Sequence, residues 1–198
     1  FDTNQLLQKA KSEEEIFSLT ASQLMKLLNR SLIVYPEQNG DLGSEQVFEI
    51  DGEVPCNIFS APEERDAANW TFANKKRSGA GTDSYPDTKG LYLALRTGGG
   101  VFGVIGIDLS EKPLDAFENS VLLSILGEGA LAIENRRNAL EKEQATVQAK
   151  NEELRANLLR TISHDLRTPL TSISGNADTL LHSYNVLDEQ TRKQIFTD

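Results

Sequence analysis

The residues best suited to chemistry form the run Ser163-His164-Asp165-Leu166-Arg167-Thr168-Pro169-Leu170. The run places a histidine beside a carboxylate and four residues before a hydroxyl, within a stretch of helical apolar spacing. Each helical residue turns by ~100°, so His164 and Thr168 lie on one side of such a helix and Asp165 lies next to the imidazole. A neutral imidazole is available because histidine titrates near neutral pH, and a neighbouring carboxylate can take or orient its ring proton. The spacing predicts a histidine that accepts a phosphoryl group.

The helix that must position this histidine has an apolar face on its opposite side. Its apolar positions are Leu158, Ile162, Leu166, Ile173, Ala177 and Leu180. His164 points ~160–180° away from them, which places its side chain in solvent. Pro169 removes a backbone hydrogen bond to residue 165, so we expect a kink just after the histidine. The apolar face predicts pairing with a second copy of the helix, while His182 is given no role.

The run 163–170 resembles the H-box of bacterial sensor histidine kinases, and none of its positions departs from that pattern. The resemblance implies that His164 accepts phosphate from ATP, that Asp165 assists as acid or base, and that Thr168 positions water for phosphatase activity. The phosphate would pass to an aspartate of a response-regulator receiver domain. ATP and Mg²⁺ would bind to a further domain that the sequence does not contain, so this chain alone is expected to be inactive.

Composition limits the partners of this chain. Its 198 residues include 20 Lys and Arg against 30 Asp and Glu, a net charge of −10 that disfavours nucleic acid. The single cysteine, Cys56, excludes an internal disulfide and fits a reducing cytoplasm. No uninterrupted apolar run reaches the ~18–20 residues of a membrane span. Both ends look cut, so we expect further segments and interpret the chain as the cytoplasmic portion of an inner or plasma membrane protein.

Residues 1–138 alternate helical and strand patterns, which predicts an α+β fold with an antiparallel sheet and flanking helices. Ser12 and Glu15 predict a helix start by mutual capping, and the apolar stripe continues to about Asn29. Strands are expected at 32–35, ended by Pro36, and at 47–50, 91–95 and 101–109; a helix is expected at 62–76 and a loop at 78–90. The glycines of 98–103 fit a dinucleotide-binding spacing, but they lead into a strand and predict a hairpin turn.

Trp70, the Gly-Ala-Gly-Thr-Asp loop at 79–83 and the strand pair at 91–95 and 101–106 resemble a GAF domain. The resemblance is strongest to the GAF domain of potassium-responsive sensor kinases. It implies a small-ligand pocket between the sheet and a covering helix or loop, although no cofactor or metal ion is predicted for this chain. The candidate lining residues are Trp70, Arg77, Thr82, Asp83 and Tyr92, although the core is the favoured place for Trp70.

A long helical stretch joins the two regions. Ile133, Leu140, Val147 and Leu154 recur every seven residues, and the second apolar position of each heptad is filled by Arg137, Gln144 and Asn151. This predicts a weak two-stranded coiled coil or a solvated single helix. The expected domains are 1–138, GAF-like; 139–157, a signalling linker helix; and 158–198, the first helix of a helical-hairpin phosphoacceptor (HisKA) domain.

The sequence therefore predicts a homodimeric sensor histidine kinase of a two-component system that controls potassium-transport genes. Two alternatives stay open at this point. One is a small-ligand-binding GAF module with a passive dimerising helix, and the other is a coiled-coil scaffold without either function. Phosphorylation of His164 would separate the first prediction from both.

Overall fold

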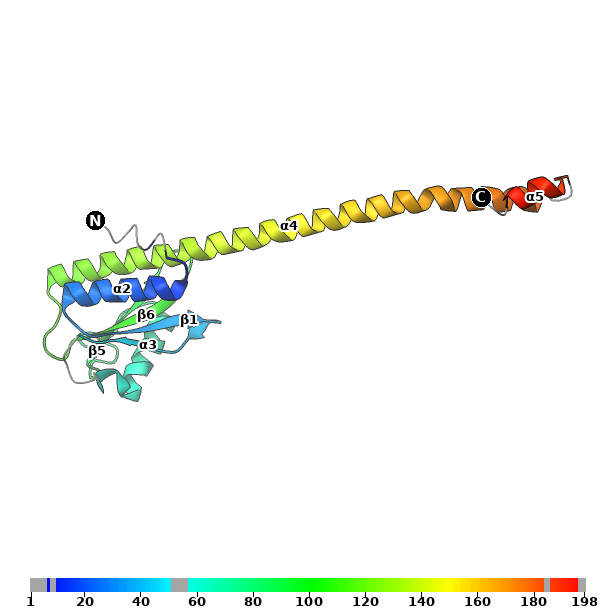
Figure 1. The fold of residues 1–198 in the computed structure, drawn as a ribbon. Coiled ribbons are helices and arrows are strands. Elements are labelled where there is room, and N and C mark those ends of the chain that lie inside the picture. Colours follow the sequence, from blue (N-terminus) through cyan, green and yellow to red (C-terminus); the bar gives the residue numbers. More distant parts are fainter. Residues whose placement is uncertain (1–6, 8–9, 51–56, 184–185, 196–198) are drawn as a thin grey trace. The chain divides into compact units, whose positions relative to one another are not determined.

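The computed structural model describes residues 7, 10–50, 57–183 and 186–195 (Figure 1). Cys56 lies outside these residues, as does the side chain of Leu180. The chain divides into two compact units, an N-terminal unit of residues 1–140 and a C-terminal unit of residues 141–198. Each unit is described by itself.

The N-terminal unit contains an antiparallel sheet of six strands with helices on both of its faces. Along the chain the elements are α2 (Glu13–Leu28), β1 (Leu32–Gln38), β2 (Asp41–Leu42), β3 (Gln46–Phe48), a 3₁₀ helix (Asn57–Ser60), α3 (Pro62–Asn74), β4 (Ser78–Gly79), β5 (Gly90–Arg96), β6 (Val101–Asp108), α4 (Ala116–Ser183) and α5 (Glu189–Ile195). The strand order is β2-β1-β6-β5-β4, and β3 pairs with the first half of β1. The predicted α+β class is confirmed.

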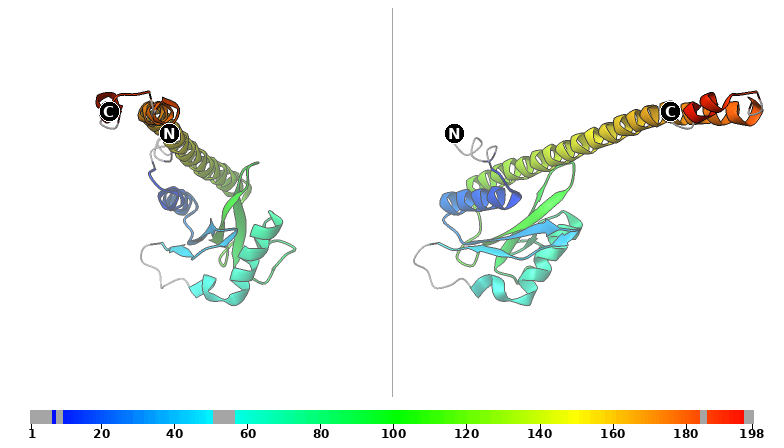
Figure 2. Two further views of the ribbon diagram at one scale, coloured as in Figure 1. Left: turned by 90° about the vertical axis from the view of Figure 1, so that its right-hand side faces the viewer. Right: turned by 45° about the vertical axis from the view of Figure 1, so that its right-hand side comes forward.

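Two apolar cores lie on opposite faces of the sheet. On one face, α2 and the first turns of α4 pack against the strands, as the two views of Figure 2 show. On the other face, α3 packs through Ala67, Ala68 and Phe72 against Tyr35 and Tyr92 of the sheet. The β5–β6 hairpin is central to both cores and turns at Thr97–Gly100, where the N–H of Thr97 donates to the carbonyl of Gly100 at 3.0 Å. The glycine run is therefore a hairpin turn, as predicted.

The prediction that Pro36 ends the first strand is wrong, because β1 continues to Gln38. Pro36 pairs with Gly103 of β6, and its carbonyl accepts a hydrogen bond from the N–H of Gly43 at 2.7 Å. Proline lacks the backbone N–H but keeps the carbonyl. A strand therefore tolerates proline at a position where only the carbonyl has to form a hydrogen bond. The chain then turns at Asn39 and Gly40, both with positive φ, into β2.

The helix ends follow local capping chemistry closely. Ser12 Oγ accepts the N–H of Glu15 at 3.1 Å, whereas the Glu15 carboxylate accepts the N–H of Lys11 at 2.7 Å. Helix α3 starts at Pro62 and ends at Asn74, because Lys75 adopts a left-handed conformation. The expected loop at 78–90 contains the short strand β4, which the sequence pattern did not reveal.

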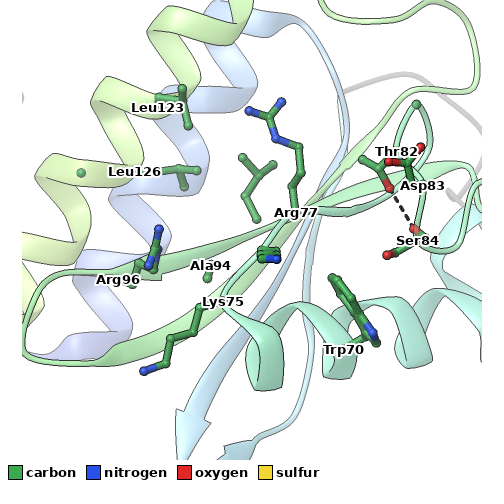
Figure 3. Close-up of a pocket in the computed structure, with 14 residues that line it drawn as sticks. Trp70, Lys75, Arg77, Thr82, Asp83, Ser84, Ala94, Arg96, Leu123 and Leu126 are labelled. Carbon is green, nitrogen blue, oxygen red and sulfur yellow. Dashed lines mark hydrogen bonds between the residues drawn. The ribbon is translucent and has the colours of Figure 1, made fainter.

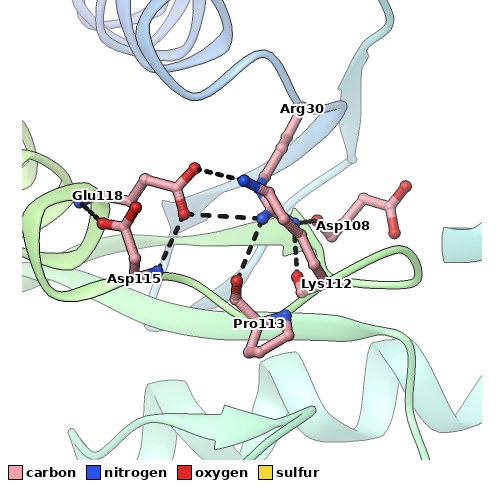
Figure 4. Close-up of polar contacts among 6 residues, drawn as sticks. All are labelled: Arg30, Asp108, Lys112, Pro113, Asp115 and Glu118. Atoms are coloured by element: carbon pink, nitrogen blue, oxygen red, sulfur yellow. Dashed lines mark hydrogen bonds and ion pairs between the residues drawn. The ribbon is translucent and has the colours of Figure 1, made fainter.

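Arg30 fixes the loop that leads into α4 (Figure 4). Its guanidinium is buried and donates to the carbonyl oxygens of Asp108 at 3.0 Å, Lys112 at 2.9 Å and Pro113 at 3.4 Å. At the helix start, the N–H of Glu118 donates to Asp115 Oδ1 at 2.7 Å and the N–H of Asp115 donates back to Glu118 at 3.0 Å. The backbone N–H of Asp115 and the ammonium of Lys112 hold the pKa of Glu118 below its ordinary value. These contacts set where α4 begins and how it enters the domain.

Helix α4 begins inside the N-terminal core. Ile133, expected in a coiled-coil seam, is fully buried there together with Leu122, Ile125 and Leu126. An 18-residue stretch of this helix, with mean hydropathy 1.3, has the length and composition of a membrane span without being an uninterrupted apolar run. That is weak evidence, because a core helix of a soluble protein passes the same test and a third of the stretch is buried.

Candidate functional site

His164 lies on the C-terminal part of α4 with most of its side chain in solvent. Its Nδ1 is 3.5 Å from Oδ1 of Asp165, and the two side chains are 79% and 71% exposed. Thr168 is also exposed, one helical turn further along. The helix is continuous through Pro169. The three predicted residues are therefore brought together on one helix, with one imidazole nitrogen beside a carboxylate and the other unobstructed by it.

The apolar face of the same helix has no covering element in the C-terminal unit as described. Leu158, Ile162, Leu166 and Ile173 are all more than half exposed, as are Leu159 and Leu170. Such a continuous apolar surface is unusual on a monomer in water and is typical of a helix that packs against a partner. His182, by contrast, has Nδ1 3.1 Å from Oδ1 of Asp178, an exposed pair four residues apart.

The predicted ligand-pocket residues divide into two groups. Trp70, Arg77, Thr82 and Asp83 line one pocket of about 890 Å³ at an edge of the sheet (Figure 3). Trp70 is partly exposed there and is absent from both apolar cores, so the prediction that favoured a core position for it is wrong. The hydroxyl of Thr82 donates to the carbonyls of Gly79 and Ser84, both at 2.8 Å, and so shapes the loop.

Tyr92 does not reach this pocket. It is fully buried, and its hydroxyl donates to the Glu64 carboxylate at 2.7 Å. Glu64, itself buried, also accepts the backbone N–H groups of Lys89 at 2.7 Å and Gly90 at 3.2 Å. Burial, and next the Glu64 carboxylate, raise the pKa of Tyr92 well above its ordinary value. The prediction that Tyr92 lines the pocket is wrong because alternation along β5 turns its side chain under α3.

Three further cations that were not predicted line the same pocket: Lys75, Lys76 and Arg96. Lys75 and Lys76 directly precede Arg77, so a run of three basic residues at the end of a helix was a visible signal. Arg96 gave no such signal in the sequence, because it reaches the pocket only through the strand pairing of β5.

The helical segment that carries His164 and the chain as a whole are each similar to known proteins. Residues 154–197 match the family model of the His Kinase A (phospho-acceptor) domain. Sensor protein KdpD of Clostridium acetobutylicum is 34% identical over 96% of this chain and 21% of its own length. Sensor protein KdpD of Escherichia coli K12 is 32% identical over 76% of this chain and 16% of its own length. The chain thus spans about a fifth of the length of the first of these relatives.

Solved structures agree on the fold. The native GAF domain of the potassium sensor histidine kinase KdpD from Escherichia coli superposes with a TM-score of 0.52 at 20% identity, over 74% of this chain and 95% of that one. A methyl-accepting chemotaxis protein, residues 122 to 287, gives a TM-score of 0.51 at 14% identity, over 70% and 98%. At these identities the likeness concerns the fold alone.

The fold of the N-terminal unit and the matched helix define a sensor histidine kinase segment, in which a GAF domain precedes the start of a HisKA domain. Within that class, the chain is similar over most of its own length to the KdpD-type sensor proteins. The predicted resemblance is confirmed.

Proposed function

We propose that the full-length protein is a histidine kinase that autophosphorylates at His164 and passes the phosphate to an aspartate of a response regulator. The observation that carries this proposal is the exposed imidazole of His164 with the Asp165 carboxylate beside its Nδ1, within the segment that matches the phospho-acceptor family. The sequence similarity to two proteins named sensor protein KdpD supports the class of activity.

The position of Asp165 favours one ring nitrogen as the nucleophile. A carboxylate near Nδ1 favours the tautomer that carries its proton there, so the lone pair of Nε2 is free. Nε2 would attack the γ-phosphorus of ATP, forming the N–P bond while the bond to the β-phosphate oxygen breaks and ADP leaves. The positive charge that forms on the ring would be relieved by loss of the Nδ1 proton toward Asp165. Magnesium and nucleotide would be supplied by another domain, so the chain alone is expected to be inactive.

The exposed apolar face of α4 supports a homodimer through residues 158–173, as the HisKA match implies for this class. Thr168 would position a water molecule for dephosphorylation of the regulator. The assignment of 139–157 as a signalling linker and of 158–198 as the phosphoacceptor helix stays a prediction, as do the control of potassium-transport genes and the location on the cytoplasmic side of a membrane.

The test uses the full-length protein with labelled ATP and Mg²⁺, compared with His164→Gln and with His182→Gln as the matched control. The expected product is acid-labile label that is lost in His164→Gln and retained in His182→Gln. Label that is absent from the wild type, or that survives His164→Gln, would reject the kinase and favour a ligand-binding GAF module with a passive helix.

A further inference from the structure

The pocket of about 890 Å³ lies where one edge of the sheet is left open. Strand β4 pairs with β5 only at Leu91 and Tyr92, so residues 93–96 of β5 have no strand partner on that side among the described residues. The end of α3, the loop at 81–84 and α4 surround this edge, as Figure 3 shows. The volume falls within the ~300–1,000 Å³ that is typical of small-molecule sites.

The charge of the pocket is opposite in sign to that of the chain. Lys75, Lys76, Arg77 and Arg96 line it, against the single carboxylate of Asp83. In the part of the chain that the structure describes, none of these four cations forms an ion pair. A chain with a net charge of −10 therefore gathers four uncompensated cations around one cavity. Unpaired cations that line one cavity create a local potential that favours an anion.

We infer that this pocket binds a small polyanion of the polyphosphate class. Phosphate groups match the demand because each carries up to two negative charges and several acceptor oxygens, and arginine binds them through two parallel hydrogen bonds. The rest of the lining suits an organic portion of such a ligand, since Trp70 offers an aromatic surface and Leu123 and Leu126 of α4 offer an apolar wall.

A second pocket in the same unit has the opposite character. It is lined by Glu63, Glu64 and Asp87 against the one cation Lys89, so it would repel the same ligand. The anion site is therefore assigned to the sheet edge. The occupant would also touch Gly127, so it would lie against the first turns of α4.

The test measures binding of inorganic triphosphate to the 198-residue chain by isothermal titration calorimetry at constant ionic strength. The key variant is Arg77→Gln/Arg96→Gln. The matched control, Lys142→Gln/Arg155→Gln, makes the same charge change at two exposed positions of α4 outside the pocket. Circular dichroism and the thermal midpoint establish that each variant is folded.

The expected result is saturable binding that weakens at least ~10-fold, or 1.4 kcal/mol, in Arg77→Gln/Arg96→Gln and stays unchanged in the control. Arg77→Lys/Arg96→Lys, which keeps the charge without the planar fork, is expected to bind with intermediate affinity. Affinity weaker than ~1 mM, or equal losses in the two glutamine variants, would overturn the proposal. Tighter binding of an extended glutamate peptide than of triphosphate would overturn it in favour of a peptide site. None of these outcomes depends on the kinase activity.

Discussion

The guanidinium of Arg137 on α4 lies 2.8 Å from Oε2 of Glu37 on β1. The same guanidinium donates to both carboxylate oxygens of Glu13 on α2 at 2.9 Å, and it stands 5.2 Å from the centre of the Phe102 ring. One partly buried cation thus joins α4, α2 and β1, four residues after Ile133 enters the core. The sequence pattern places Arg137 at a position of the coiled coil that is normally apolar. In the structure, Arg137 instead anchors α4 to the GAF domain.

Replacing this anchor is expected to destabilise the GAF domain. Arg137→Met removes the partner of two carboxylates and is expected to lower the free energy of unfolding by about 1–3 kcal/mol. Urea denaturation followed through the fluorescence of Trp70, the only tryptophan, measures it. The control Arg155→Met, at an exposed position without an ion pair among the described residues, is expected to change stability by less than ~0.5 kcal/mol. Equal effects of the two substitutions would show that Arg137 does not act as an anchor.

The same contact gives the stability a pH dependence. Partial burial raises the pKa of Glu37, but hydrogen bonds from the Gly40 N–H and from Arg137 outweigh it and hold the pKa below its ordinary value of 4.5. A carboxyl whose pKa is lowered by folding stabilises the folded state above its unfolded pKa, and this contribution is lost as the pH falls through the folded value. Glu37→Gln is therefore expected to cost stability near pH 7.

The measurement is the difference in unfolding free energy between wild type and Glu37→Gln along a pH series. The difference is expected to be constant above pH 4.5 and to shrink toward zero at lower pH, as Glu37 of the wild type becomes protonated. A difference that stays constant down to the lowest pH would mean that the charge of Glu37 contributes nothing.

Alanine substitutions at two glycines of α4 are expected to change the stability of the protein in opposite directions. A Cβ at Gly129 would lie 2.7 Å from Oγ1 of Thr20, a buried hydroxyl that donates to the carbonyl of Ile16 at 2.8 Å, so Gly129→Ala is expected to cost about 1–3 kcal/mol. A Cβ at Gly127 would meet nothing within 4 Å, so Gly127→Ala is expected to add about 0.5–1 kcal/mol by helix propensity alone. Thermal unfolding of both variants measures whether each substitution raises or lowers the stability. Stabilisation by both alanines would contradict the close α2–α4 packing.

Features that depend on neighbouring residues were the ones that could be predicted. The Ser12 cap and the start of α3 at Pro62 each follow from chemistry within a few positions. The run 163–170 was recognisable for the same reason, because His164, Asp165 and Thr168 lie within five consecutive residues of one helix.

Features that depend on the packed sheet could not be predicted. Pro36 continues β1 because Gly103 of β6 pairs with it, and Ile133 leaves the heptad seam because the first turns of α4 cover the sheet. Arg96 joins Lys75, Lys76 and Arg77 in one pocket only through the register of β5. No local pattern carries that information, since each case is decided by residues far away in the sequence.

The central claim is that His164 is the phosphoacceptor, and the most direct measurement is to locate the phosphate. The full-length protein would be incubated with ATP and Mg²⁺, digested at neutral or mildly alkaline pH and mapped by tandem mass spectrometry. The account predicts one phosphoryl group on His164 in the peptide that contains residues 163–167, and none on His182, Asp165 or Thr168. Phosphate on any other residue, with His164 unmodified, would contradict it.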